Sequence, residues 1–220
     1  MDGLSIRRRI ALDIARSMRK SQEEEHPLRQ LFWECTLRCN LRCQHCGSDC
    51  KQVAATPDMP KEDFFKVLDS IAAKTDPHKV FVIISGGEPT MRADLEECGK
   101  GIYSRGFPWG MVTNGFGMTA ERFSRLLGAG LHSMTVSLDG LEENHDWLRG
   151  REGSFTRAAE TIRMAVRSGI AFDVVTCVNR RNYSQLPQLK EFLIGLGLKE
   201  WRLFSIFPQG RAALNPDLQL

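Results

Sequence analysis

Apolar residues follow two alternating patterns along most of the chain, short continuous runs and longer stretches with helical spacing. The continuous runs, which are typical of buried strands, fall at 31–36, 80–84, 109–113, 133–138, 171–178 and 201–204. Stretches with helical spacing separate them, at 61–73, 93–105, 119–127, 154–168 and 186–196. Near-continuous apolar strands that alternate with helices indicate an α/β fold with a parallel sheet buried on both faces.

Glycine and polar residues gather just after the strands, which is where parallel barrels build their sites. This placement favours a barrel over a doubly wound sheet, and the alternation predicts a partial (β/α)6 TIM-like barrel that stays open. The chain ends soon after the sixth strand, at 210–220, without a clear sixth helix. A closed eight-stranded barrel is therefore not expected. We interpret the chain as truncated after the barrel, with 214–220 as the start of a C-terminal extension.

Before the first strand, Ile6, Ile10, Ile14 and Met18 follow one another at four-residue intervals. This spacing predicts an amphipathic helix with arginines on its other face. We expect the helix to cover the open end of a domain. Binding to a membrane surface is the alternative, because basic amphipathic helices also do that.

The length of 220 residues suits one sizeable domain, which we place at 27–213 behind an N-terminal helix and acidic linker at 1–26. An apolar share of 42% supplies a core, and no apolar run approaches the roughly 20 residues that span a bilayer. With no secretory signal in the sequence, we expect a cytoplasmic protein without a membrane partner. The net charge of +3 is small and spread out, so nucleic acid is not an expected partner either.

Cysteine is the residue type that points most directly to chemistry. Five of the seven cysteines fall within sixteen residues of the chain. An odd number of cysteines without an export signal argues against a disulfide scaffold, and clustered thiols in a reducing compartment more often bind a metal or a cluster. Cys98 and Cys177 lie apart from the others and are expected to be small buried residues.

Cys39, Cys43 and Cys46 place three thiols within eight residues, directly after the first strand. Such close spacing in a loop lets three thiolates converge on one inorganic centre. A [4Fe–4S] cluster has four irons, so three cysteines leave one iron open to a ligand, much as a catalytic zinc keeps one open position. The spacing therefore favours a cluster with a reactive iron.

A zinc site is the alternative reading of this loop, with Cys35, His45 or Cys50 as the fourth ligand. Zinc loops usually come as two halves, and the sequence has no second pair of cysteines at the expected distance. We expect His45 to pack against a ligand rather than bind a metal. Cys50 lies one residue too far along for the motif and has no assigned role.

The order of further motifs on the strand ends resembles the radical S-adenosylmethionine (SAM) superfamily. The CxxxCxxC loop after the first strand is followed by Ser85-Gly-Gly-Glu-Pro89 after the second. The further matches are Thr113-Asn-Gly115, Ser137-Leu-Asp-Gly140, His145-Asp146, Arg149-Gly150 and Glu152-Gly-Ser-Phe155. These motifs are similar in particular to the peptide- and protein-modifying branch that normally carries a C-terminal SPASM or twitch domain with auxiliary clusters. The similarity covers 31–213, and the sequence has no cysteine beyond Cys177 for such clusters.

The resemblance implies two cofactors, a [4Fe–4S] cluster and SAM, and assigns residues to both. The three cysteines of the loop would hold the cluster and act as the catalytic cysteines, with the methionine part of SAM on the open iron. Gly86, Gly87 and Glu88 would approach the amino group of SAM, since glycine lets backbone reach a ligand without a Cβ in the way.

Four further contacts with SAM follow from the same resemblance. Ser137 would hydrogen-bond the carboxylate or the ribose, and Arg149 would pair with the carboxylate through its planar fork of donors. Asn114 would contact the ligand, although an Asn-Gly pair is also an ordinary turn. Asn179, after the fifth strand, would hold the adenine through backbone contacts.

The resemblance also implies a reaction. A reduced cluster delivers one electron to the sulfonium of SAM, the carbon–sulfur bond breaks to give methionine and a 5′-deoxyadenosyl radical, and the radical abstracts hydrogen from a substrate. We expect a peptide or protein side chain as the substrate, and flavodoxin or ferredoxin as the electron donor. The alternatives are the same chemistry on a small cofactor precursor such as a tetrapyrrole, and a noncatalytic iron–sulfur or zinc module. Asp139 and the pair His145-Asp146 are expected to be structural rather than proton-transfer groups.

Overall fold

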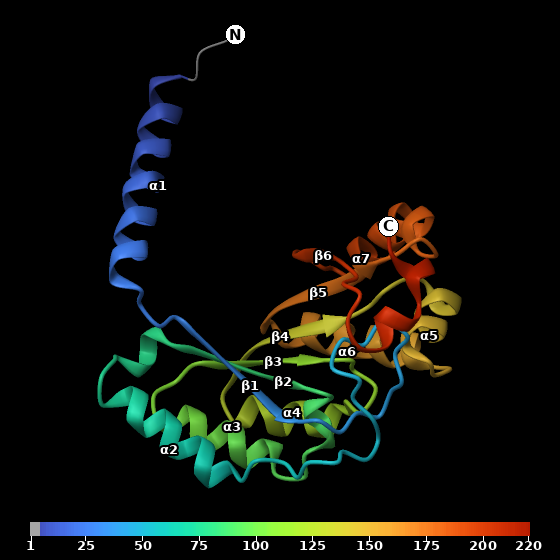
Figure 1. The fold of residues 1–220 in the computed structure, drawn as a ribbon, viewed down its shortest axis with the longest axis horizontal. Coiled ribbons are helices and arrows are strands. Elements are labelled where there is room, and N and C mark those ends of the chain that lie inside the picture. The colour runs from blue at the N-terminus through green and yellow to red at the C-terminus, as the bar shows by residue number, and fades with distance from the viewer. Residues whose placement is uncertain (1–4) are drawn as a thin grey trace.

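The structure, a computed structural model, describes residues 5–220 and contains one six-stranded sheet in which neighbouring strands are parallel (Figure 1). The strands lie side by side in chain order: β1 (Gln30–Thr36), β2 (Phe81–Gly86), β3 (Trp109–Thr113), β4 (Leu131–Ser137), β5 (Ala171–Val178) and β6 (Trp201–Ser205). Because β1 pairs only with β2 and β6 only with β5, the sheet is an open, partial barrel. The predicted fold class is confirmed, and each expected strand lies within two residues of its expected bounds.

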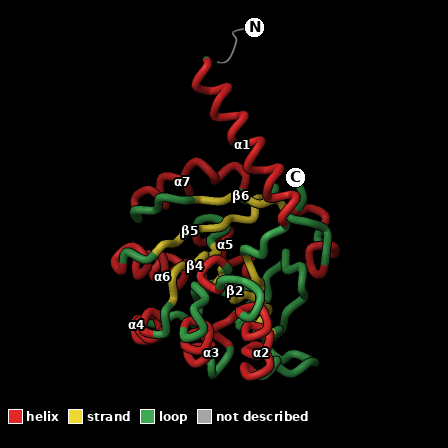
Figure 2. Tube along the Cα trace, turned by 90° about the vertical axis from the view of Figure 1, so that its left-hand side faces the viewer, coloured by secondary structure: helices red, strands yellow, loops and turns green. Residues whose placement is uncertain are grey.

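Helices cover the outer, convex face of this curved sheet (Figure 2). They are α2 (Lys61–Ala72), α3 (Leu95–Tyr103), α4 (Ala120–Gly128), α5 (Glu142–Arg149), α6 (Ser154–Ser168) and α7 (Leu186–Gly195). Large apolar side chains fill the layer between sheet and helices: Trp33 of β1 stacks on Phe64 of α2 with ring centroids 3.9 Å apart. Trp109 is fully buried and donates its Nε1 hydrogen to the Ala129 carbonyl at 3.2 Å. Each such side chain contributes about 1.5–3 kcal/mol through burial.

The short helix α5 was not predicted, because its mostly polar sequence carries no apolar period. Its Asp146 caps the next helix: the carboxylate accepts hydrogen bonds from the backbone N–H groups of Gly153 at 2.6 Å and Phe155 at 2.7 Å. The Ser154 hydroxyl donates to the same carboxylate at 2.8 Å. These contacts show the structural role that was expected of Asp146, since a side-chain acceptor at a helix N-terminus satisfies otherwise unpaired N–H groups.

The N-terminal helix α1 (Ile6–Glu25) stands clear of the rest of the molecule in both views (Figures 1 and 2). The expectation that it covers the open end of the barrel is therefore wrong. The acidic stretch that we expected to be a linker is helical through Glu25. The first four residues of the expected N-terminal region lie outside the described residues. Among the described residues, no helix is both long enough and apolar enough to cross a membrane.

Candidate cofactor site

The loops that follow the parallel strands meet around one cavity of about 230 Å3. Nine of the ten predicted site residues line it: Cys39, Cys43, Cys46, Gly86, Gly87, Glu88, Asn114, Ser137 and Arg149. These residues come from four different strand ends, so the parallel topology itself gathers them. Their individual roles toward a cofactor stay predictions.

The two glycines after β2 are needed because the cysteine loop crosses them at close range. Gly87 donates its backbone N–H to the Thr36 carbonyl at 2.7 Å, and Glu88 donates its own to the Arg38 carbonyl at 2.9 Å. A Cβ on Gly86 would lie 2.3 Å from the Thr36 oxygen, and one on Gly87 would lie 2.2 Å from the Arg38 oxygen. Gly86 also has a φ of +127°, which side chains rarely adopt. The glycines therefore fix the start of the cysteine loop against the end of β2.

Glu88 braces the ends of β2 and β3. Its buried carboxylate accepts hydrogen bonds from the Thr90 hydroxyl at 2.8 Å, the Thr113 hydroxyl at 2.7 Å and the Asn114 backbone N–H at 2.7 Å. Burial raises the pKa of Glu88, and these donors oppose that rise. Since the side-chain oxygens are already occupied by donors of the chain, the backbone of Glu88 is the part best placed to meet a ligand.

Two polar side chains reach the thiols of the loop. The Asn114 amide nitrogen lies 3.9 Å from Cys39 Sγ and donates to Asn40 Oδ1 at 2.8 Å. The Arg149 Nη1 lies 3.8 Å from Cys43 Sγ. Hydrogen-bond donors beside the sulfurs of an iron–sulfur cluster stabilise negative charge there and tune its reduction potential.

Arg149 is held by Asp139, which sequence reasoning did not place in the site. The Arg149 Nε donates to Asp139 Oδ2 at 2.6 Å, while the Cys177 backbone N–H donates to Oδ1 at 2.8 Å. The Asp139 backbone N–H in turn donates to His145 Nδ1 at 3.0 Å. Burial opposes ionisation of Asp139, but the charge of Arg149 holds its pKa below the usual value. The expected structural roles of Asp139 and His145 agree with these contacts.

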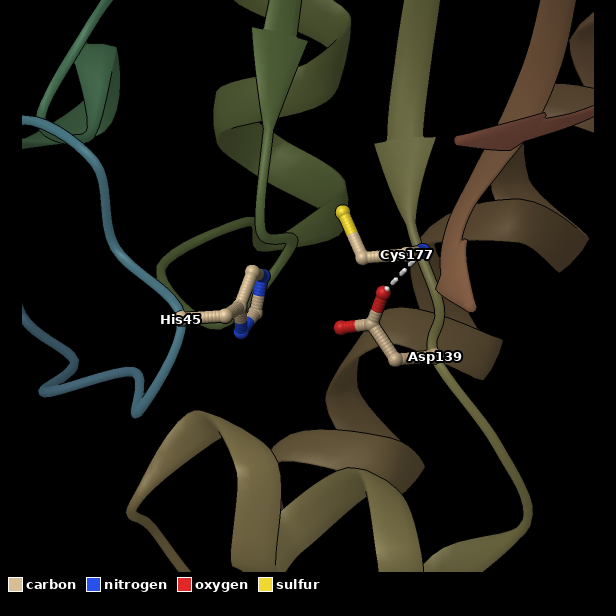
Figure 3. Close-up of side chains that lie close together, drawn as sticks. All are labelled: His45, Asp139 and Cys177. Atoms are coloured by element: carbon tan, nitrogen blue, oxygen red, sulfur yellow. Dashed lines mark hydrogen bonds between the residues drawn. The ribbon is translucent and has the colours of Figure 1, made fainter. Parts of the chain in front are cut away.

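His45, Asp139 and Cys177 bring three potential metal-ligating atoms within 4.8 Å of one another (Figure 3). The charge balance argues against a separate metal site at this point. Asp139 already pairs with Arg149, whose charge would repel a cation. His45 is neutral, because burial lowers its pKa to about 4. We interpret the group as the packed floor beside the cysteine loop.

The structure does not bring Asn179 to the cavity. Its side-chain oxygen accepts backbone N–H groups from Arg181 at 3.0 Å and from Asn182 at 3.2 Å, and its amide donates to the Cys177 carbonyl at 3.2 Å. The side chain thus shapes the turn after β5, which is the ordinary use of asparagine in loops.

Sequence reasoning missed Arg211, which clamps the cysteine loop from the C-terminal segment. Its Nε donates to the Cys43 carbonyl at 2.7 Å, and its Nη1 donates to the Cys50 carbonyl at 3.0 Å and to Asp49 Oδ1 at 2.7 Å. Its backbone N–H donates to the Cys46 carbonyl at 2.9 Å. Only the fold brings this arginine to a loop more than 160 residues earlier, so no local signal could have found it.

The neighbours of Arg211 reinforce this clamp, and Cys50 shares it. A Cβ on Gly210 would lie 2.3 Å from the Gly47 carbonyl oxygen, so only glycine lets the two segments touch. Asn215 donates its amide to the Gln44 carbonyl at 3.2 Å. Cys50 is buried and lines the same cavity as the three motif cysteines.

The chemistry of the donor set fits an iron–sulfur cluster. Burial raises the pKa of Cys39 to about 12 and also raises that of Cys43, against which the Arg149 charge acts. Buried thiolates therefore need a strong positive partner, which iron supplies. Three thiols, a cavity and donors aimed at two sulfurs provide that setting.

Sequence comparison finds relatives of one kind along most of the chain. The profile described as "Radical SAM superfamily" matches residues 33–193. The chain is 30% identical over 192 residues to the Fe-coproporphyrin III synthase of Methanosarcina barkeri (strain Fusaro / DSM 804), covering 86% of the chain and 47% of that protein. It is 28% identical over 192 residues to the PqqA peptide cyclase of Methylocella silvestris, covering 84% of the chain and 51% of that protein. The chain thus spans about half the length of the curated relatives it matches.

Solved structures share the fold. Streptococcus suis SuiB bound to S-adenosylmethionine superimposes with a TM-score of 0.70 at 17% identity, over 94% of this chain and 48% of that one. The enzyme anSMEcpe with bound AdoMet gives a TM-score of 0.71 at 18% identity, over 82% of this chain and 52% of that one. These similarities show a common architecture around the cavity.

Proposed function

The chain belongs to the radical SAM superfamily, and from that membership we propose that Cys39, Cys43 and Cys46 hold a [4Fe–4S] cluster at which SAM is cleaved. The observation that supports the proposal most is the single cavity that these cysteines share with the Gly-Gly-Glu turn, Ser137 and Arg149. The cofactors of the superfamily are a [4Fe–4S] cluster and SAM. When bound and reduced, the cluster supplies the electron that splits the sulfonium of SAM.

The residues around the cavity have separate tasks in this proposal. Arg149, fixed by Asp139, offers a rigid cation for the carboxylate of SAM, and Ser137 adds a hydroxyl beside it. Asn114 holds the thiol of Cys39 by a long hydrogen bond. Arg211 keeps the carbonyls of the loop in place, so that the three thiols stay converged. Orientation and exclusion of water are what a protein adds to cofactor chemistry.

For the substrate, we propose a peptide or protein side chain that enters along the inner face of the sheet. A second cavity of about 300 Å3 lies on that face, and Val112 lines both cavities, so the two are neighbours. The edge strands carry exposed aromatic side chains, Phe32 on β1 and Phe204 on β6. A broad, partly aromatic surface suits an extended substrate better than a compact one.

A tetrapyrrole side chain is the second candidate substrate, and the sequence relatives favour it. Several of the curated relatives are named Fe-coproporphyrin III synthase or AdoMet-dependent heme synthase, at 28–30% identity. The inner cavity also offers a cation for a propionate: Arg202 donates to Thr135 at 3.0 Å and pairs with Asp173. In either case the reaction needs an external one-electron donor, for which we propose flavodoxin or ferredoxin.

The proposal is tested by anaerobic reconstitution with iron and sulfide, reduction with dithionite, and chromatography of 5′-deoxyadenosine after SAM is added. We expect product from the wild type and none from Cys43→Ala. Cys98→Ala is the matched control, because Cys98 is an equally buried free thiol in α3, far from the motif in sequence and absent from the cavity. Stoichiometric zinc without iron uptake would contradict the proposal and favour a noncatalytic module.

The substrate classes are separated by mass spectrometry of reactions that contain either iron coproporphyrin III or a peptide mixture. A mass loss on the porphyrin that depends on SAM would support the tetrapyrrole candidate. A SAM-dependent change confined to one peptide would support the peptide candidate.

A further inference from the structure

Helix α1 displays an apolar stripe that the described fold leaves uncovered. Ile6, Ile10, Ile14 and Met18 are 77%, 55%, 55% and 59% exposed. They recur every four residues, so they lie along one face of the helix. Four large apolar side chains in one exposed row differ from the scattered apolar residues of an ordinary surface, and they indicate a binding face.

The positive charge of the chain is concentrated on the same helix. The stretch from Ile6 to Lys20 contains six basic residues and one acidic residue, a net charge of +5, whereas the whole chain carries +3. The remainder therefore has a net charge of −2. At 100° per residue, Arg8, Arg16 and Arg19 project from the face opposite the stripe, and Arg7 lies beside it. The helix thus offers an apolar face bordered by cations.

The spacing argues against a second copy of the helix as the partner. A two-stranded coiled coil needs apolar residues alternately three and four apart. If Ile10 takes one of the two seam positions, Arg7 falls on the seam; if it takes the other, Asp13 falls there. Either register buries a charge at the centre of the contact, which is costly. A flat apolar medium has no such register requirement.

We propose that α1 lies in the surface of a membrane rich in anionic lipid, with the isoleucine stripe among the acyl chains and the arginines against lipid phosphates. Charge complementarity and the segregated apolar face are the two properties by which such helices bind. The helix leads into β1 at its N-terminal end, whereas the cofactor cavity lies at the opposite ends of the strands. Membrane binding through α1 therefore leaves that cavity open.

The experiment is co-sedimentation of the full chain with phosphatidylcholine vesicles that contain either no phosphatidylglycerol or about 30 mol % of it. We expect binding to the anionic vesicles only, weakened when sodium chloride rises from about 0.05 M to about 0.5 M. Ile14→Asp should reduce the bound-to-free ratio ~10-fold or more, because it places a carboxylate in the stripe.

Leu12→Asp is the matched control for this variant. Leu12 lies on the same helix but on the opposite face, and the substitution changes the net charge by the same amount. We expect it to reduce the bound-to-free ratio only about twofold, through charge alone. Neither side chain belongs to the core, so both variants should keep the fold.

Three results would overturn the inference. The first is equal loss of binding in the two variants. The second is no binding to anionic vesicles at low salt. The third is a concentration-dependent dimer, measured by light scattering, that Ile14→Asp abolishes, since this would make a second copy the occupant of the stripe.

Discussion

The rim of the cofactor cavity and helix α1 depart from the usual distribution of side chains in opposite directions. The rim buries charged groups, namely Glu88, Asp139 and Arg149, whereas α1 exposes isoleucines such as Ile10 and Ile14. Each buried charge has partners within the chain, and these partners tie one strand end to the next. The stripe on α1 has no apolar cover in the described structure, so its partner must come from outside. Internal pairing therefore marks a preorganised site, and an uncovered face marks a binding surface.

Removing a buried partner should separate the two regions most clearly. Asp139→Ala leaves the Arg149 guanidinium unpaired in the interior, and should lower the free energy of unfolding by about 3–5 kcal/mol. Ile14→Asp on α1 should change it by no more than about 0.5 kcal/mol. Urea unfolding of the cluster-free proteins at one pH provides the comparison. Similar losses in both variants would contradict it.

The buried histidine of the rim makes stability depend on pH in a defined window. Burial lowers the pKa of His145 to about 4, whereas in the unfolded chain it titrates near 6.5. As the pH falls from 6.5 to 4, the unfolded state takes up a proton that the folded state does not, so stability is lost, by up to about 3 kcal/mol. Above 6.5 this group contributes no pH dependence.

His145→Gln keeps a side chain that can accept the Asp139 N–H but does not titrate. The variant should therefore lose less stability than the wild type between pH 6.5 and 4. Thermal unfolding at several pH values measures this difference, and equal slopes in the two proteins would show that His145 does not titrate as described.

The close approach after β2 predicts a further, smaller effect. Gly87→Ala forces a Cβ to within 2.2 Å of the Arg38 carbonyl oxygen, so the cysteine loop must shift, at about 1–3 kcal/mol. The same variant should take up less iron during reconstitution. Gly128→Ala is the control, because a Cβ there meets no atom within 4 Å and alanine favours the helix by up to about 1 kcal/mol. Unfolding and iron analysis of both variants test the contrast.

Most of the fold could be predicted from the sequence because strands and helices differ in apolar period. The β3 and β5 bounds were predicted to the residue, since uninterrupted apolar runs end there in polar turns. Helix α5 escaped because its buried residues include Asn144 and His145, which no apolar pattern reveals. The position of α1 could not be predicted either, since an amphipathic pattern predicts an apolar face without saying what covers it.

The site was predictable as far as local motifs reach. Three cysteines and four strand-end turns could be read along the chain, and the parallel topology brings them to one edge. Asn179 was placed by analogy, and its own turn uses the side chain instead. Asp139 was identified but not linked to Arg149, and Arg211 lies more than 160 residues from the loop it holds. Such pairings arise from tertiary contact alone.

Arg211 gives the smallest of the expected effects. Arg211→Lys keeps the charge but cannot reproduce the fork that meets Cys43, Asp49 and Cys50, so about 1 kcal/mol of loop stability should be lost. The reconstituted variant should release iron to a chelator faster than the wild type. Arg105→Lys, which alters an ion pair with Asp69 away from the cavity, should not. Equal release rates in the two variants would show that the clamp does not support the cluster.

The measurement that tests the central claim most directly is electron paramagnetic resonance of the reduced, reconstituted protein before and after addition of SAM. If Cys39, Cys43 and Cys46 hold a [4Fe–4S] cluster with one open iron in this cavity, SAM should change the spectrum of the wild type and of Cys98→Ala. Cys43→Ala should show no SAM-sensitive cluster signal. A cluster spectrum in the wild type that SAM leaves unchanged would contradict the account.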